Sequence, residues 1–115
     1  MGRPVVHFEI LGTDGEALQS FYRDLFDWNI DTNNPLNYGM VDTGAEGGIG
    51  GGVSAGQDGT GVRIYIAVDD PQAYLDRVEQ MGGTVVIPVT EIPDTVTIAL
   101  FADPQGNVIG LVKAP

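Results

Sequence analysis

The chain has 115 residues, of which 43% are hydrophobic, and this is enough for one domain with a modest core. Its 16 acidic and 5 basic residues give a net charge of −11, which argues against nucleic acid and anionic membranes as partners, since both are bound through Lys and Arg. The sequence has no cysteine, no apolar run near the ~20 residues that span a bilayer and no signal-peptide pattern, so we expect a cytoplasmic protein.

The first half of the chain predicts one helix and four strands. Side chains alternate along a strand, so His7 and Glu9 share one face of the first strand and Phe8 takes the other. Thr13-Asp14-Gly15-Glu16 fits a capping box, in which the Thr hydroxyl and the Glu carboxylate satisfy free amides at the start of a helix. An apolar stripe at helical spacing then runs from Ala17 to Leu25. The expected strands are 5–11, 28–31, 36–43 and 49–55.

The second half predicts the same order of elements. Asp70 is the expected helix N-cap, with Pro71 at the first helical position, where its missing N–H costs nothing. Gly82-Gly83 ends this helix, because glycine tolerates the left-handed cap. Asp103-Pro104-Gln105-Gly106 has the chemistry of a type I turn and joins the last two strands. The expected strands are 62–68, 84–89, 95–102 and 107–113, and Gln57 to Thr60 connects the halves.

The two halves are copies of one supersecondary unit. Residues of the same type recur at one constant offset: Ile10 and Ile66, Asp14 and Asp70, Ala17 and Ala73. The unit reads βαβββ, so we expect a single domain over residues 1–115 built from two modules, at about 1–56 and 57–115. Each module has a sheet with a helix on one face, so its other face must be covered by the second module or line a cavity.

Several sequence features occur together with this repeat. They are His7 in the first strand, Val68-Asp69-Asp70 before the second helix, the ending from Phe101 to Leu111, and the aromatic cluster Phe21, Tyr22, Phe26 and Trp28. In this combination the whole chain resembles the vicinal oxygen chelate superfamily, which includes glyoxalase I, extradiol dioxygenases and the bleomycin and fosfomycin resistance proteins. The resemblance implies an α+β fold in which the two modules form a curved mixed sheet with a concave cleft and the helices lie on the outer face. It also implies a homodimer, which is common in the family.

The resemblance raises the question of a metal ion. In metal-dependent members four side chains, usually His or Glu, hold a divalent ion that acts as a Lewis acid. The corresponding positions here are His7, Gly51, Arg63 and Gly110, and only His7 can ligate, because glycine has no side chain and guanidinium has only donors. Glu9 could replace one ligand, yet catalytic sites usually supply three. We therefore expect no metal cofactor, with a divalent metal at His7 and Glu9 as the alternative.

Two features leave alternatives open. Arg63 either forms a salt bridge with Glu9 across adjacent strands or anchors a ligand carboxylate or phosphate through its bidentate fork. The glycine-rich run 47–52 includes the start of a G-x-G-x-x-A pattern, but no amphipathic helix and no Lys-Ser/Thr pair follows. We therefore interpret the run as a strand or bulge beside the cleft rather than as a phosphate-binding loop.

These observations favour a glyoxalase/bleomycin-resistance-like protein that binds a small organic molecule in the sheet cleft without the family's metal. The alternative is a lyase, isomerase or dioxygenase of the same superfamily, similar to lactoylglutathione lyase, in which His7 is a general base or a metal ligand; a third is a regulatory or subunit-interaction module. The sequence leaves open whether the chain is an enzyme. The candidate catalytic residues are His7 and Glu9, and the candidate ligand-binding residues are Arg63, Tyr65, Tyr38, Met40, Phe101, Gly51 and Gly110.

Overall fold

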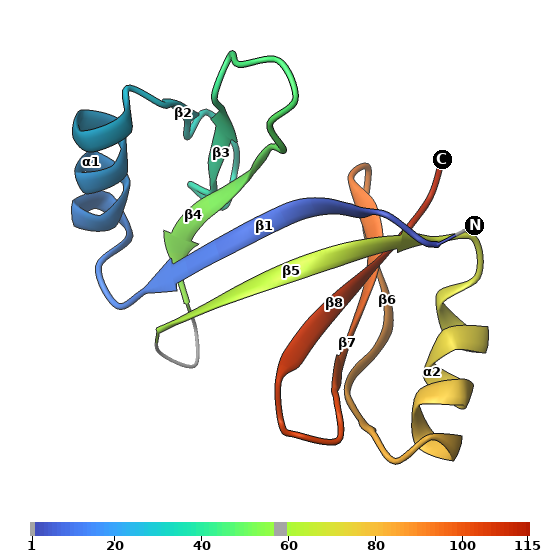
Figure 1. Cartoon of the computed structure of the whole chain (residues 1–115). Helices are drawn as coiled ribbons and strands as arrows, with labels where there is room; N and C mark the ends of the chain where they lie inside the picture. Colours follow the sequence, from blue (N-terminus) through green and yellow to red (C-terminus); the bar gives the residue numbers. More distant parts are fainter. Residues whose placement is uncertain (1, 57–59) are drawn as a thin grey trace. The chain divides into compact units, whose positions relative to one another are not determined.

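The computed structural model describes residues 2–56 and 60–115, and within them the chain forms two helices and eight strands (Figure 1). The first half contains β1(Val5–Gly12), α1(Gly15–Phe26), β2(Asn29–Asp31), β3(Gly39–Asp42) and β4(Gly51–Ala55). The second half contains β5(Gly61–Val68), α2(Pro71–Gln80), β6(Thr84–Ile92), β7(Val96–Ala102) and β8(Val108–Lys113). Both halves therefore have the βαβββ order, and the predicted α+β fold class is confirmed. Most of the predicted connection lies outside the described residues, at positions 57–59.

The chain divides into two compact units, His7–Arg63 and Met1–Val6 with Ile64–Pro115. This division differs from the expected module boundary near residue 57, because the opening residues of β1 belong to the second unit and those of β5 to the first. Neither helix of the described chain has both the length and the apolar character needed to cross a bilayer.

The unit His7–Arg63 is a mixed four-stranded sheet in the order β2-β3-β4-β1. β1 and β4 are parallel and the other pairs antiparallel. The helix-side core consists of Ile30, Val41 and Val53, and Val53 is fully buried, which is worth roughly 1.5–3 kcal/mol. Against this core pack Phe8, Ile10, Leu18, Tyr22 and Trp28, so the aromatic cluster near the end of α1 has a packing role.

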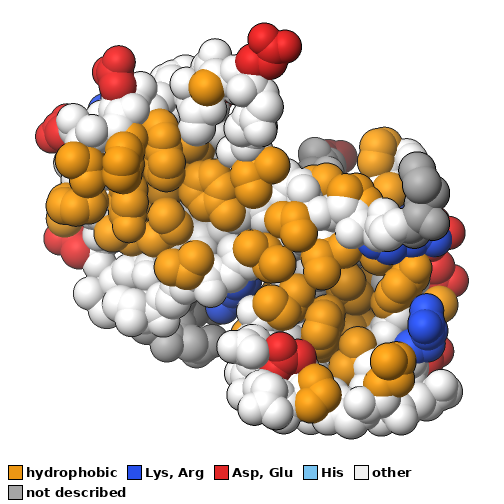
Figure 2. Space-filling view, in the orientation of Figure 1, with side chains coloured by type: hydrophobic (Ala, Val, Ile, Leu, Met, Phe, Trp, Pro, Cys, Tyr) orange, Lys and Arg blue, Asp and Glu red, His pale blue; other side chains and the backbone are white. Residues whose placement is uncertain are grey.

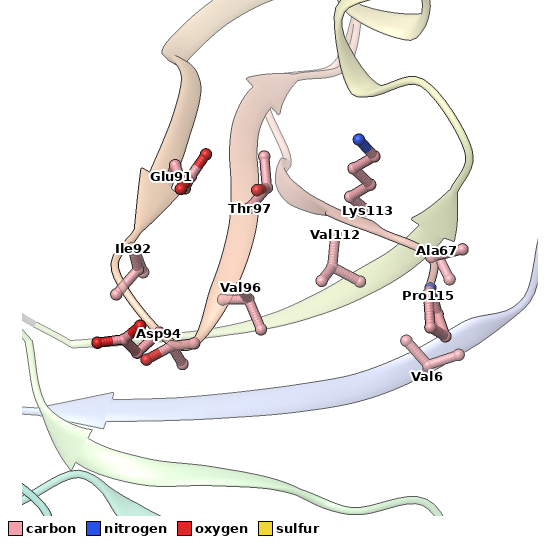
Figure 3. Close-up of a pocket in the computed structure, with 12 residues that line it drawn as sticks. Val6, Ala67, Glu91, Ile92, Asp94, Val96, Thr97, Val112, Lys113 and Pro115 are labelled. Carbon is pink, nitrogen blue, oxygen red and sulfur yellow. The ribbon is translucent and has the colours of Figure 1, made fainter.

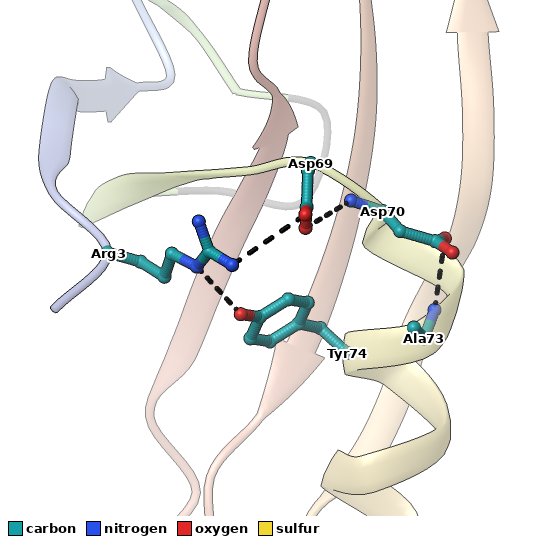
Figure 4. Close-up of polar contacts among 5 residues, drawn as sticks. All are labelled: Arg3, Asp69, Asp70, Ala73 and Tyr74. Carbon is teal, nitrogen blue, oxygen red and sulfur yellow. Dashed lines mark hydrogen bonds and ion pairs between the residues drawn. The ribbon is translucent and has the colours of Figure 1, made fainter. Parts of the chain in front are cut away.

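The second unit repeats this arrangement with the order β5-β8-β7-β6, in which β5 and β8 are parallel. Its core residues are Val68, Leu75, Ala99 and Leu111. The start of the chain is tied to α2 of the same unit (Figure 4): Arg3 Nε donates to the Tyr74 hydroxyl at 2.8 Å, and Arg3 Nη2 lies 3.7 Å from Asp69 Oδ2.

The two helices begin at equivalent caps. Asp14 Oδ1 accepts from the Ala17 amide at 3.1 Å, and Asp70 Oδ1 accepts from the Ala73 amide at 3.2 Å. The expectation that the Thr13 hydroxyl caps α1 is wrong: Asp14 has the extended backbone of an N-cap, at φ −118° and ψ 96°, so the helix starts one residue later. The prediction for Asp70 is confirmed, and the constant offset between the halves therefore holds at the level of hydrogen bonds.

The turn before β8 forms as predicted. The Gly106 amide donates to the Asp103 carbonyl at 2.9 Å, which is the i to i+3 bond of a β-turn. The Asp103 side chain accepts from the Asn107 side chain at 2.8 Å and from the Asn107 amide at 2.9 Å. These bonds, led by the one from the Asn107 side chain, lower the pKa of Asp103 because they stabilise its charged form. Gly106 itself has φ +89°, which explains why glycine ends the turn.

Candidate functional site

A chain of polar side chains lies on the face of the first unit that points away from α1. His7 Nε2 is 3.0 Å from the Tyr38 hydroxyl, which donates to Glu9 Oε2 at 2.9 Å. Glu9 Oε1 is in turn 3.8 Å from Arg63 Nε. Four residues named as candidates from the sequence are thus brought together within one unit, in the order His7, Tyr38, Glu9 and Arg63.

Local structure positions each of these groups. His7 and Glu9 share one face of β1 because side chains alternate along the strand. Tyr38 precedes β3, where Asn34 holds its backbone from both sides: Asn34 Nδ2 donates to the Tyr38 carbonyl at 2.7 Å and the Tyr38 amide donates to Asn34 Oδ1 at 2.9 Å. Asn34, which lies in the connection between β2 and β3, therefore fixes the backbone of a site residue.

Two glycines make room for two tyrosine rings. A Cβ built on Gly52 would overlap the hydroxyl and ring of Tyr38, and a Cβ built on Gly110 would overlap the ring of Tyr65. Gly52 is paired with Glu9 and Gly110 with Tyr65, so the two glycines hold matching positions on the strands beside β1 and β5. Each unit thus has a tyrosine ring packed directly against a glycine of its sheet.

The register corrects one candidate. Gly51 is paired with Phe8, and its missing Cβ points into the Phe8 ring on the helix side of the sheet. The expectation that Gly51 shares a face with His7 is therefore wrong by one residue, and Gly52 takes its place. Strand pairing decides this, since a shift of one residue moves a side chain to the opposite face. The run of three glycines at 50–52 gave no signal to distinguish the positions.

Phe101 is the second correction. It packs against the core cluster of Val68, Leu75, Ala99 and Leu111, on the side of its sheet that faces α2. Its neighbour Leu100 is paired with Gly110, so Leu100 rather than Phe101 shares the Tyr65 face. Met40 is paired with Gly52, which is itself paired with Glu9, so Met40 lies on the same face as Glu9 one strand beyond Gly52, and it is 48% exposed.

The surroundings of His7 disfavour the charged form of its imidazole. Burial lowers the pKa of His7, and the charge of Glu9 opposes this shift only in part. Because the Tyr38 hydroxyl gives its proton to Glu9, the bond from His7 requires Nε2–H to be the donor. In the neutral ring the lone pair then lies on Nδ1.

Glu9 is the most buried ionisable group of this site. It is 9% exposed and interacts with both the Tyr38 hydroxyl and the Arg63 guanidinium. Of the two roles expected for Arg63, the structure shows the ion pair with Glu9. Removing one member of such a pair is costly because the other charge is left partly buried without its partner.

The donor set does not fit the family's metal centre. Of the corresponding positions, Gly52 and Gly110 carry no donor and their space is filled by Tyr38 and Tyr65, while Arg63 brings a positive charge. Among the described residues no group of three or more His, Asp or Glu side chains could hold a metal ion. His7 and Glu9 alone fall below the three ligands of a usual catalytic site.

The second unit offers an apolar surface on the corresponding face. Ala67 and Val112 are paired with each other and lie two residues beyond Tyr65 and Gly110, so all four share that face. Ala67 and Val112 line a pocket of about 670 Å³ together with Val96, and Lys113 and Glu91 also lie in its lining (Figure 3). The unit therefore combines a mainly apolar wall with a few charged groups at its edge.

The fold is that of the glyoxalase, bleomycin resistance and dioxygenase class of proteins. The sequence profile of the glyoxalase-like domain matches residues 7–112, and the chain belongs to this family. A curated relative from Mycobacterium tuberculosis (strain CDC 1551 / Oshkosh), named "Putative glyoxylase CFP32", is 33% identical over 111 residues, which are 89% of this chain and 42% of the relative. The chain thus spans about two-fifths of the length of the curated relatives it matches.

Solved structures show the same fold at low sequence identity. A superfamily member from Vibrio splendidus 12B01 has a TM-score of 0.68 at 17% identity, covering 98% of this chain and all of that one. A hypothetical protein from Bacillus halodurans C-125 has a TM-score of 0.72 at 13% identity, covering 100% of this chain and 96% of the other. Methylmalonyl-CoA epimerase from Mycobacterium tuberculosis has a TM-score of 0.65 at 16% identity, covering 96% and 88%. The predicted superfamily is confirmed.

Proposed function

We propose that this chain binds a small organic molecule against the sheet face of His7, Glu9, Tyr38 and Arg63, and that binding needs no divalent ion. The observation that carries the proposal is the filling of the Gly52 and Gly110 positions by tyrosine rings, which leaves no space for side-chain ligands there. We propose this sheet face as the binding site because the polar chain from His7 to Arg63 places hydrogen-bond donors and acceptors on the same face as the exposed Met40. Such a mixture of apolar surface and few polar groups is typical of ligand pockets.

Arg63 is the group we expect to contact a ligand's polar atoms. Its ion pair with Glu9 is long, at 3.8 Å through Nε, and its side chain is 24% exposed. The guanidinium fork therefore has capacity for a ligand carboxylate, phosphate or carbonyl oxygen. A ligand with a cationic part would in addition gain from the net charge of −11.

Isothermal titration calorimetry tests the proposal with two probes suggested by the names of the structural neighbours, bleomycin and methylmalonyl-CoA. We expect at least one probe to bind with the same affinity in EDTA and in added Zn²⁺ or Ni²⁺, and Arg63→Ala to weaken it at least 10-fold. Arg77→Ala, which removes an exposed arginine on α2, is the matched control and leaves the affinity unchanged. Binding that requires a metal and disappears in His7→Ala would refute the metal-independent site.

A second candidate function is proton transfer by His7. It is favoured by the burial that keeps the imidazole neutral and by the tautomer that places its lone pair on Nδ1. The neighbour Streptomyces coelicolor methylmalonyl-CoA epimerase is described in complex with 2-nitronate-propionyl-CoA, so a CoA thioester is a reasonable substrate to try. Exchange of its α-proton in D₂O, followed by NMR, tests this activity; exchange that His7→Ala leaves intact would eliminate His7 as the base.

We further propose that the chain is a homodimer, as the family resemblance implies. Sedimentation velocity over a concentration series measures the oligomeric state directly. A chain that is still monomeric at about 100 µM, roughly the highest dissociation constant of a weak specific dimer, would exclude the homodimer.

A further inference from the structure

The outer face of α1 is apolar although it is exposed. Phe21 is 56% exposed, Leu25 58% and Phe26 54%, and Figure 2 shows hydrophobic side chains gathered over this helix. Ala17 lies one turn before Phe21 and is exposed as well. Large apolar patches of this kind on a protein surface mark interaction sites.

The second module provides an internal comparison. Its helix α2 begins at the equivalent cap, so Phe21, Leu25 and Phe26 correspond to Arg77, Met81 and Gly82. Two of the three apolar positions are thus polar or without a side chain on α2. The fold itself therefore does not require an apolar outer face on this helix, and the patch on α1 calls for a separate explanation.

Deepening the proposed homodimer, we infer that this face of α1 packs antiparallel against the same face in a second copy of the chain. The ridge Ala17, Phe21, Leu25 has one residue per turn, small at one end and large at the other. When two such ridges are reversed with Phe21 on the two-fold axis, Leu25 of one copy meets Ala17 of the other. A single surface patch that is complementary to itself is what an isologous dimer requires.

The exposed apolar area agrees with this occupant. With about half of each large side chain exposed, the patch offers roughly 300 Å² of apolar surface. A standard interface buries about 800 Å² per partner with an apolar centre and a polar rim, so the patch has the size of such a centre.

Sedimentation velocity of the full chain and its variants tests the inference. Phe21→Arg introduces the residue found at the equivalent position of α2, and we expect it to raise the dimer dissociation constant at least 100-fold. Met81→Arg is the matched control, because Met81 is 70% exposed on α2, and it leaves the dimer intact. An unchanged dimer in Phe21→Arg, or a wild-type chain that is monomeric, would overturn the inference.

A second variant separates specific packing from general stickiness. Ala17→Phe makes the patch more apolar but places a ring where Leu25 of the partner belongs, so we expect weaker dimerisation; stronger association would contradict the antiparallel packing. Circular dichroism checks that each variant is folded. Probe binding measured by calorimetry is retained in Phe21→Arg, since the His7 and Glu9 face lies on the other side of the sheet from α1. Loss of the dimer and failure of the ligand proposal are therefore distinguishable.

Discussion

The Tyr38 hydroxyl connects the two candidate catalytic residues, and Tyr38→Phe removes it while the ring stays over Gly52. The change takes a hydrogen bond from Glu9, which is 9% exposed, and leaves His7 Nε2–H without this acceptor. A hydrogen bond to a charged group is worth about 1.5–3 kcal/mol, so we expect the free energy of unfolding to fall by about 2 kcal/mol at neutral pH.

Urea unfolding followed by the fluorescence of Trp28 measures this effect, because Trp28 is the single tryptophan and packs in the same unit. Tyr22→Phe is the matched control: Tyr22 lies in that unit with its ring stacked on Trp28 at 5.5 Å, and we expect a change below ~0.5 kcal/mol. A loss of less than ~0.5 kcal/mol in Tyr38→Phe would refute the polar chain as a stabilising element.

Three further predictions concern the pKa of His7, the glycine at position 52 and the corrected position of Phe101. Burial lowers the pKa of His7 in the folded protein below its value of about 6.5 in the unfolded chain. The neutral imidazole therefore contributes fully to stability above about pH 6.5, and this contribution is lost as pH falls through the folded-state pKa. Because His7→Gln removes the titrating group, the difference in unfolding free energy between pH 7.5 and pH 5.5 should be smaller in this variant. Gly52→Ala should lower the free energy of unfolding by about 1–3 kcal/mol, because the new Cβ overlaps Tyr38, and Tyr38→Ala in the same chain should remove this loss. Gly61→Ala is the control: its Cβ meets nothing within 4 Å, so we expect almost no change in the free energy of unfolding. Phe101→Ala should lower the free energy of unfolding by about 3 kcal/mol yet leave probe affinity unchanged by calorimetry; weakened binding in a folded variant would return Phe101 to the ligand face.

The order of elements followed from local patterns. Alternation placed His7 and Glu9 on one face, and the cap at Asp70 and the turn at Asp103 were recognisable because such motifs satisfy their hydrogen bonds within a few residues. The cap of α1 was misplaced because Thr13 and Asp14 are both good caps, and only the backbone conformation distinguishes them.

The candidate site was recovered in part. His7, Glu9, Tyr38 and Arg63 were all named from the sequence, and the structure places them in one connected chain. Asn34, which holds the backbone of Tyr38, was not among the candidate residues. Gly51 and Phe101 were assigned to the wrong faces, because parity on the later strands depends on pairing with strands distant in the sequence.

The sequence by itself determined that one βαβββ unit is used twice and that the second copy replaces a histidine with Arg63, since repeats and residue types are local properties of the chain. Only the tertiary structure decided which glycine stands beside Glu9 and what fills the space above it. Strand register sets the partner of each residue, and the absence of a Cβ at Gly52 and Gly110 has consequences only once the rings of Tyr38 and Tyr65 are placed over them.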